Sequence, residues 1–261
     1  MGYWILVTIV VLAGLAVLVA VVASEARPAP IRRGPAPRRP WVVLGSGAPD
    51  GTPRGWVALA AGTLPAGVAV HDLSEPGATI ADVRLAQLPA ALALEPAVVT
   101  VLTGPVDLLG GVPLIDYAED LSETLTALAA VGCRAVVVTV PDLSRLPGLT
   151  EGDRDLAGLR TLVATWNAAI VQVARSRRAA VVDLSPASRA LLGPGTSLDG
   201  RGFRPGPAAT ERLATLLGRA AARALATGPL TAGDSEGPDA DPLPRTVGPA
   251  TVPRTAPGHG V

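Results

Sequence analysis

The sequence predicts an α/β domain in which a five-stranded parallel sheet lies between two layers of helices. Short apolar runs recur without polar alternation, which is typical of strands buried on both faces. Segments with helical spacing separate these runs; Leu121, Leu125 and Leu128, for example, share one helix face. Repeated strand–helix units imply right-handed crossovers and therefore a three-layer sandwich.

The first strand organises the rest of the domain. The run Trp41-Val42-Val43-Leu44 stops at Gly45-Ser46-Gly47, and a helical pattern follows. The last residues of such a strand lie at the carboxyl edge of the sheet, where ligands bind in open α/β folds. The predicted strands are residues 41–44, 68–71, 97–102, 135–140 and 179–182. The predicted helices are residues 53–64, 80–94, 114–131, 155–176 and 207–226.

Composition excludes several classes of function. The 261 residues suffice for one α/β domain with appendages. The 22 basic residues, all arginine, balance 22 acidic ones, so no basic excess indicates nucleic acid binding. The single Cys133 excludes an internal disulfide and a cysteine metal cluster, and His71 and His259 are too far apart in the sequence to support a metal site by themselves. We therefore expect no metal and no cofactor.

The amino-terminal residues 1–25 are predicted to form a membrane anchor. Residues 3–23 are an uninterrupted apolar run, and a bilayer core needs about 20 residues. A cleaved signal peptide, with a weak cleavage site near Ala23-Ser24, is the alternative. No Lys or Arg precedes the run, and the run is longer than the usual signal core, so an uncleaved single span is favoured.

Two appendages flank the predicted domain, which covers residues 41–227. Residues 26–40 are rich in arginine and proline and are predicted to form a semi-rigid stalk that spaces the domain from lipid and could bind anionic headgroups. The stalk arginines place the domain on the cytoplasmic side by the positive-inside tendency. Residues 228–261 lack periodicity and large apolar clusters and are predicted to be a disordered tail. His259 lies in this tail and is not expected to be catalytic.

The stretch after the first strand resembles the first block of the SGNH/GDSL hydrolases, a family of esterases, lipases and acyltransferases. That block reads L-G-D-S-x-T-x-G, and its serine is the nucleophile. Aligned without gaps, Leu44, Gly45 and Gly51 match the block. Ser46 falls at the aspartate, and Gly47 falls at the nucleophile.

Two further blocks resemble the segments that carry the family's oxyanion hole. Residues 72–79 follow the pattern N-L-x-x-S-G-A-T, and Gly77 takes the position of the oxyanion-hole glycine. The block G-x-N-D corresponds to Gly104-Pro105-Val106-Asp107. Val106 therefore replaces the oxyanion-hole asparagine, and Asp107 is expected to cap or hydrogen-bond the loop after its strand.

The last block, D-x-x-H-P, supplies the family's acid and general base. Its best match is Arg201-Gly202-Phe203-Arg204-Pro205, which places Arg201 at the acid and Arg204 at the histidine. Asp199 takes the acid position only if two residues are inserted. Arg201 and Arg204 could line the vestigial pocket and hold a carboxylate or phosphate. The alternative, that both are solvated loop arginines, is favoured because such loops are mobile.

The resemblance implies a flavodoxin-like α/β sandwich with strand order 2-1-3-4-5, but not the family's chemistry. Serine catalysis needs a hydroxyl, a base and donors for the oxyanion. Glycine has no nucleophile, valine has no donor, and arginine stays protonated. We therefore expect a non-catalytic, membrane-anchored protein that binds an acyl or anionic small molecule or acts as a scaffold. The expected vestigial pocket comprises Gly47, Gly77, Val106, Asp107, Arg201 and Arg204.

Three alternatives remain open at this stage. An active esterase or acyltransferase could use a relocated Ser46–His71 pair, with Asp50 or Asp72 orienting the ring. An envelope structural protein could act through its stalk and tail. The domain could also lie outside the cytoplasm, because many SGNH esterases are secreted.

Overall fold

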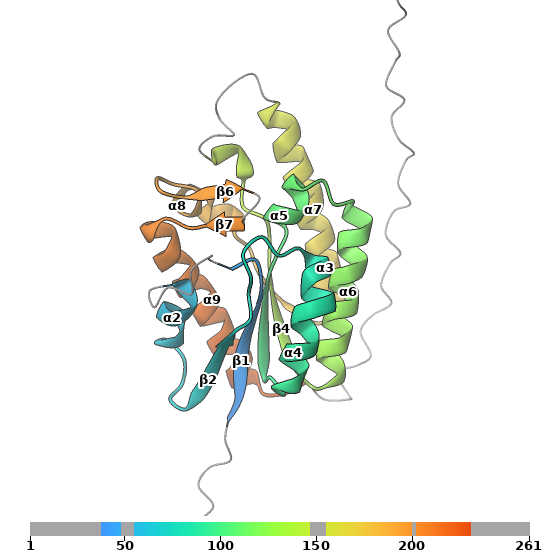
Figure 1. The fold of residues 1–261 in the computed structure, drawn as a ribbon, viewed down its shortest axis with the longest axis vertical. Helices are drawn as coiled ribbons and strands as arrows, with labels where there is room; N and C mark the ends of the chain where they lie inside the picture. Colours follow the sequence, from blue (N-terminus) through green and yellow to red (C-terminus); the bar gives the residue numbers. More distant parts are fainter. Residues whose placement is uncertain (1–37, 48–54, 147–154, 200–201, 231–261) are drawn as a thin grey trace, which may run out of the picture. The chain divides into compact units, whose positions relative to one another are not determined.

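The computed structural model describes residues 38–47, 55–146, 155–199 and 202–230. Within these ranges the predicted sheet is confirmed, with five strands in the order β2-β1-β3-β4-β5 (Figure 1). The strands are β1 (Arg38–Gly45), β2 (Val68–Asp72), β3 (Val98–Leu102), β4 (Arg134–Val138) and β5 (Ala180–Val182). All five residues of β3 are buried because helices cover both faces of the sheet, which is why this strand shows no polar alternation.

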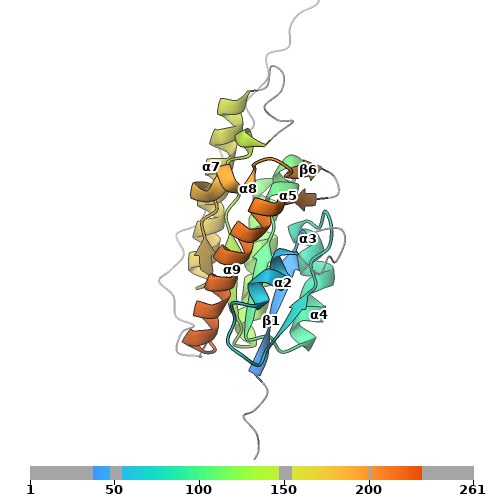
Figure 2. The same cartoon turned by 90° about the vertical axis from the view of Figure 1, so that its left-hand side faces the viewer.

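Two helical layers enclose the sheet (Figures 1 and 2). The layer on one face consists of α2 (Trp56–Ala61) and α9 (Pro207–Thr227), which pack against each other. The other layer consists of α6 (Leu114–Ala130), α7 (Leu156–Ser176) and a helical run made of α3 (Ile80–Asp82), the π-helical turn η1 (Val83–Gln87) and α4 (Leu88–Ala93). The three-layer sandwich is thus confirmed, and the long helices begin and end close to their predicted residues.

The indole of Trp41 anchors α2 to the sheet. Trp41 is fully buried, and its Nε1 donates to Thr100 Oγ1 on the neighbouring strand at 2.9 Å. Its ring packs against Trp56 of α2, with centroids 6.3 Å apart and planes tilted by 60°. The buried indole N–H is therefore satisfied, and the rings tie the short helix to the centre of the sheet.

Several short elements were not predicted, and all of them follow the carboxyl ends of strands. They are too short for a helical or alternating period to appear in the sequence. The unpredicted elements are α5 (Pro105–Leu109), η2 (Leu143–Arg145), η3 (Ser185–Ala187), α8 (Ser188–Leu191) and the antiparallel hairpin of β6 (Ser197–Asp199) and β7 (Gly202–Arg204).

A repeated tripeptide, Asp-Leu-Ser, turns the chain at three of these strand ends. These copies are residues 72–74, 142–144 and 183–185, and a fourth copy, residues 120–122, lies within α6. In each of the three loop copies the aspartate Oδ1 accepts the backbone N–H of the serine, at 3.1 Å, 3.2 Å and 2.9 Å respectively. This is the Asx-turn pattern, in which a short polar side chain replaces a backbone acceptor. The same local chemistry therefore shapes the loops after β2, β4 and β5.

The domain boundaries differ from the predicted ones by a few residues. β1 begins at Arg38, within the range assigned to the stalk, and the backbone N–H of Leu230, within the range assigned to the tail, donates to Gly132 O at 3.1 Å. The apolar run 3–23, the rest of the stalk and the tail from residue 231 lie outside the described residues. Among the residues that are described, no helix has the length and apolar character needed to cross a membrane.

Candidate functional site

The site begins where β1 ends, at Gly45. Gly45 has φ of +111°, and a Cβ at this position would overlap the carbonyl oxygen of Leu102 on β3. Only glycine fits this conformation and this close approach. Ser46 N then donates to Leu102 O at 2.8 Å, and Gly47 N donates to Glu75 O at 3.0 Å. The end of β1 is thus held between β3 and the loop after β2.

The side-chain amide of Gln87, in the π-helical turn η1, hydrogen-bonds the backbone of Gly45. Gln87, only 4% exposed, accepts from Gly45 N through Oε1 at 2.6 Å and donates to Gly45 O through Nε2 at 3.2 Å. Asn167 on α7 makes the same pair of bonds to Val140 after β4, at 2.8 Å and 2.9 Å. Side-chain amides therefore satisfy the backbone where two strands leave the sheet.

Ser74 fills the space that a side chain at Gly47 would need. A Cβ at Gly47 would overlap Ser74 Oγ and lie 2.9 Å from Ser74 Cβ. Ser74 is fixed by Asp72, because its Oγ donates to Asp72 Oδ1 at 2.5 Å and its N–H donates to the same oxygen at 3.1 Å. A nucleophile at position 47 would thus displace a hydrogen-bonded turn. The N–H of Gly47 is also engaged by Glu75, so it is not offered to an oxyanion.

Ser46 points its hydroxyl into the protein. Its side chain is 6% exposed, and Ser46 Oγ has no hydrogen-bond partner among the described residues. Gly202 of β7 covers it, since a Cβ there would lie 2.7 Å from Ser46 Oγ and 2.6 Å from Gly77 N. The structure therefore brings Ser46, Gly77 and Gly202 together. It does not join Ser46 to His71 by a hydrogen bond.

Asp107 supports the site from beneath and does not line it. Asp107 is fully buried, and its two carboxylate oxygens accept from Gly104 N at 2.9 Å and Ile80 N at 2.8 Å. Burial raises the pKa of Asp107, and the hydrogen bonds from Ile80 and Gly104 offset only part of that rise. The expectation that Asp107 bonds the loop after its strand is confirmed. The carboxylate also ties the β3 loop to the start of α3.

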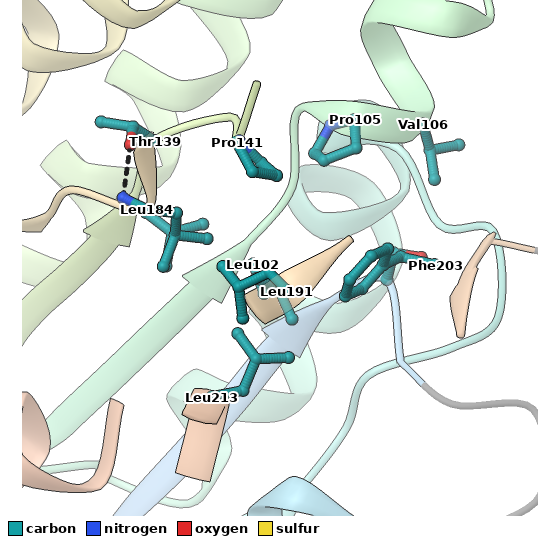
Figure 3. Close-up of a pocket in the computed structure, with 11 residues that line it drawn as sticks. Leu102, Pro105, Val106, Thr139, Pro141, Leu184, Leu191, Phe203 and Leu213 are labelled. Atoms are coloured by element: carbon teal, nitrogen blue, oxygen red, sulfur yellow. Dashed lines mark hydrogen bonds between the residues drawn. The ribbon is translucent and has the colours of Figure 1, made fainter. Parts of the chain in front are cut away.

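A small apolar pocket, which we call the Ser46 pocket, lies at the carboxyl edge of the sheet (Figure 3). Its free volume is about 20 Å³, which is room for about one water molecule. Of the described residues that line it, only Ser46 and Thr139 have polar side chains. Thr139 Oγ1 is already engaged, because it donates to Asp183 and accepts from Leu184 N, each at 2.8 Å. The apolar lining residues are Leu102, Pro105, Val106, Val138, Pro141, Leu184, Leu191, Phe203 and Leu213.

A family model for GDSL-like lipases and acylhydrolases matches residues 42–212, well over half of the chain. The chain belongs to the GDSL-like lipase/acylhydrolase family. The comparison with curated proteins gives no significant match to the chain. The solved structures described below are at most 22% identical to it, so their similarity concerns the fold alone.

Solved GDSL-type structures share the fold along most of their length. TesA superposes with a TM-score of 0.54 at 22% identity, over 68% of this chain and 95% of TesA. A catalytic mutant of Axe2, an acetylxylan esterase from Geobacillus stearothermophilus, gives 0.52 at 19% identity, over 72% and 94%. A GDSL-like lipase from Bacteroides thetaiotaomicron gives 0.53 at 16% identity, over 78% and 96%.

The block that resembles the GDSL acid and base is placed differently from what its alignment suggested. Phe203, and not Arg204, lines the Ser46 pocket. Arg204 Nε donates to Ser197 Oγ across the β6–β7 hairpin at 3.2 Å. Arg201 lies outside the described residues.

Sequence reasoning missed three residues of this GDSL-type site: Ser74, Gly202 and Phe203. Each lies inside a segment that the resemblance had already aligned, but none occupies a motif position of its own. Ser74 carried a local signal in the Asp-x-Ser turn. Gly202 and Phe203 carried none, because their role depends on how the hairpin folds onto β1.

Among the described residues, no group of histidine, cysteine, aspartate and glutamate side chains could hold a metal ion.

Proposed function

We propose that this GDSL-like domain is a non-catalytic binding domain, tethered to a membrane by residues 3–23. The observation that carries the proposal is at Gly47, where the space for a nucleophile's side chain is occupied by Ser74. If the space beside Gly47 were empty, a hydroxyl from another residue could occupy it and act as the nucleophile. Here the turn made by Asp72 and Ser74 closes that room with two hydrogen bonds.

The other groups at the site support the same conclusion. Val106 lines the pocket and has no donor for an oxyanion. The guanidinium of an arginine offers donors and no acceptor, and that of Arg204 already donates to Ser197, so Arg204 does not supply a general base. Ser46 has a hydroxyl but no base bonded to it, and its oxygen is sealed beneath Gly202. A serine hydrolase needs a nucleophile, a general base and an oxyanion donor together, since these groups act as a unit.

The chemistry of the Ser46 pocket favours a small, largely apolar ligand with one hydrogen-bonding group. Nine apolar side chains surround one buried, unpartnered hydroxyl, so a short acyl group could pack on the former and pair with the latter. The free volume of about 20 Å³ is smaller than such a group. Binding therefore requires Phe203 or a neighbouring leucine to move.

The decisive experiment assays the purified full-length protein, in detergent, against short acyl p-nitrophenyl esters. We expect no turnover above the rate of the buffer. Ser46→Ala and His71→Ala variants are assayed in parallel. Activity that disappears in both variants would establish the alternative Ser46–His71 esterase and overturn the proposal, whereas activity that neither variant changes would indicate a contaminant.

The packing at Gly47 can be tested separately by stability measurements. Gly47→Ala should destabilise the domain by about 1–3 kcal/mol because its Cβ overlaps Ser74. In a Ser74→Gly background the same substitution should cost clearly less, because the overlapping atoms are gone. Additive effects of the two substitutions would show that Ser74 does not fill the position.

The membrane tether is tested by fractionation and protease protection. The full-length protein should sediment with membranes, and the domain should resist protease added outside intact cells. Recovery in the soluble fraction would contradict the anchor, and digestion of the domain from outside would contradict the cytoplasmic placement.

A further inference from the structure

A second hollow, unrelated to the Ser46 pocket, lies where the last strand of the sheet meets α9. Its free volume is about 440 Å³, and it is walled by β5, the start of β4 and one side of α9 from Leu216 to Thr227. The charged residues around it are Arg134, Arg178, Arg219 and Arg223, with Asp183 at the carboxyl end. We call this hollow the arginine groove. All of its lining residues belong to the described part of the chain.

The positive charge of the arginine groove is concentrated on α9. Arg219 and Arg223 are four residues apart, so they lie on the same helix face, and both are exposed. Like charges at this spacing disfavour each other. Within the described residues, neither arginine has an ion pair or a side-chain hydrogen bond. The lining residues of the groove include one acidic residue, Asp183, against four arginines, so the net charge of the lining is positive.

The strand beside these arginines is also open on one side. β5 is last in the sheet order and, among the described residues, pairs only with β4, from Val136↔Ala180 to Val138↔Val182. An edge strand presents backbone donors and acceptors that can pair with an extended segment. The arginine groove thus combines main-chain groups, an apolar floor and a positive rim. These three features fit an extended acidic peptide.

The chain itself carries such a peptide just beyond the described residues. Four acidic residues, Asp234, Glu236, Asp239 and Asp241, fall within residues 234–241. The chain reaches this segment from the groove, since Thr227 lines the groove and Arg134 Nε donates to Gly228 O. From Leu230, the link to Asp234 spans at most about 14 Å when extended.

The acidic segment is also long enough to follow the wall of the groove that α9 forms. Helix α9 between Leu216 and Thr227 is about 17 Å long, and an extended segment of residues 234–241 reaches about 24 Å. We propose that the acidic segment 234–241 binds in the arginine groove of the same chain. The short link gives the segment a high effective concentration, so weak individual contacts suffice. An acidic segment of another protein would have to displace it.

The absence of lysine provides a direct test. A zero-length carbodiimide joins a carboxylate only to an amine that it touches, and in the native chain the only amine is at the amino terminus. Arg219→Lys places one amine in the groove of the full-length protein. The matched control is Arg84→Lys on the opposite layer, where Arg84 pairs with Asp120 at 2.5 Å.

After digestion and mass spectrometry, the amine introduced at position 219 should be joined to residues 234–241 within a single chain. The yield should exceed that of the position 84 control by on the order of tenfold, whereas the control should couple to Asp120 or Glu123. Equal coupling of both variants to the segment, or no coupling at position 219, would overturn the proposal. Coupling found only between two chains would show that a second copy occupies the groove, which also overturns it.

A competition experiment provides an independent measurement. The full-length chain with Asp234→Asn, Glu236→Gln, Asp239→Asn and Asp241→Asn should bind a labelled synthetic peptide of residues 234–241 on the order of tenfold more tightly than the native chain. Added salt should weaken this binding. Equal affinity for the peptide in the two chains would contradict occupation of the groove within the chain.

Discussion

The two hollows of this domain differ in what their residues do for the fold. The Ser46 pocket has about 20 Å³ of free volume and is sealed by side chains and backbone from several loops, whereas the arginine groove has about 440 Å³ and is rimmed by solvated arginines. Residues near the pocket, such as Gly45 and Gln87, pack against or hydrogen-bond buried backbone of the neighbouring strand. Arg219 and Arg223 contact no such backbone. The comparison indicates that the residues around the Ser46 pocket serve packing, whereas the residues around the arginine groove are free of that role.

The largest effect is expected from Gly45→Ala, which should cost about 3–5 kcal/mol of unfolding free energy. The new Cβ overlaps Leu102 O on the neighbouring strand, so strain and backbone displacement add. Gly67→Ala is the control, because Gly67 also has a positive φ, +82°, but a Cβ there meets no atom within 4 Å. It should cost about 1–2 kcal/mol. Equal losses for the two variants in urea unfolding would show that the close approach of β1 to β3 contributes little.

Loss of the buried amide at Gln87 should have the next largest effect. Gln87→Ala leaves the buried N–H of Gly45 without a partner, while Gly45 O keeps its bond from Glu75 N at 3.0 Å, and should cost about 1–3 kcal/mol. Asn167→Ala removes the matching pair of bonds to Val140, but in a partly exposed setting, and should cost about 1–2 kcal/mol. Urea unfolding of both variants measures the difference. The reverse order would show that the end of β4, not the end of β1, depends more on its amide.

The pH dependence of two aspartates sharpens the contrast between buried and exposed positions. Burial raises the pKa of Asp107 above 3.8, so its ionisation costs stability as pH rises from 3.8 through the folded-state pKa. Burial also raises the pKa of Asp183, but hydrogen bonds from Ser185 and Thr139 outweigh it and leave the pKa lowered. Its stabilising contribution is therefore present above pH 3.8 and is lost as pH falls through the folded-state pKa.

The two asparagine variants should consequently respond to pH in opposite directions. Relative to the native protein, Asp107→Asn should become more stable as pH rises from 3 to 7, by on the order of 1 kcal/mol. Asp183→Asn should become less stable over the same range, by a smaller amount because solvent screens this exposed carboxylate. Urea unfolding across this pH range provides the measurement. Parallel trends for the two variants would contradict the assigned environments.

The smallest effect is expected in the arginine groove. The double substitution of Arg219→Gln and Arg223→Gln should change the unfolding free energy by less than about 0.5 kcal/mol, since both side chains are exposed. Leu217→Ala, on the buried side of the same helix, should cost about 2–5 kcal/mol and serves as the control. A large loss in the double variant would show that the groove, like the Ser46 pocket, serves the fold.

Most of the fold was predictable because a strand that is buried on both faces of the sheet appears in the sequence as a continuous apolar run. Val98 to Leu102 had to be a central strand, since a continuous apolar run of that length suits a parallel sheet. The order of the strands came from the resemblance to the GDSL hydrolases and is confirmed. The hairpin of β6 and β7 and the short helix α5 were missed, because three to five residues show no period.

The site was predictable only where a residue type excludes a role. A glycine at position 47, a valine at position 106 and an arginine at position 204 lack the groups that acyl transfer needs, and this follows from chemical structure alone. The sequence also suggested Ser46 and His71 as an alternative pair. It carried no measure of the geometry between them, and the structure leaves Ser46 Oγ without a partner among the described residues.

The sequence by itself determined the layer architecture, the approximate strand ends and which side chains stand at positions 47, 106 and 204, because each depends on local patterns or on single residues. Only the tertiary structure decided that Ser74 fills the space beside Gly47, that Phe203 closes the Ser46 pocket and that Arg219 and Arg223 border an open strand. These relations join residues far apart in the chain or in separate loops. Packing in three dimensions sets their distances, and no periodicity along the sequence encodes them.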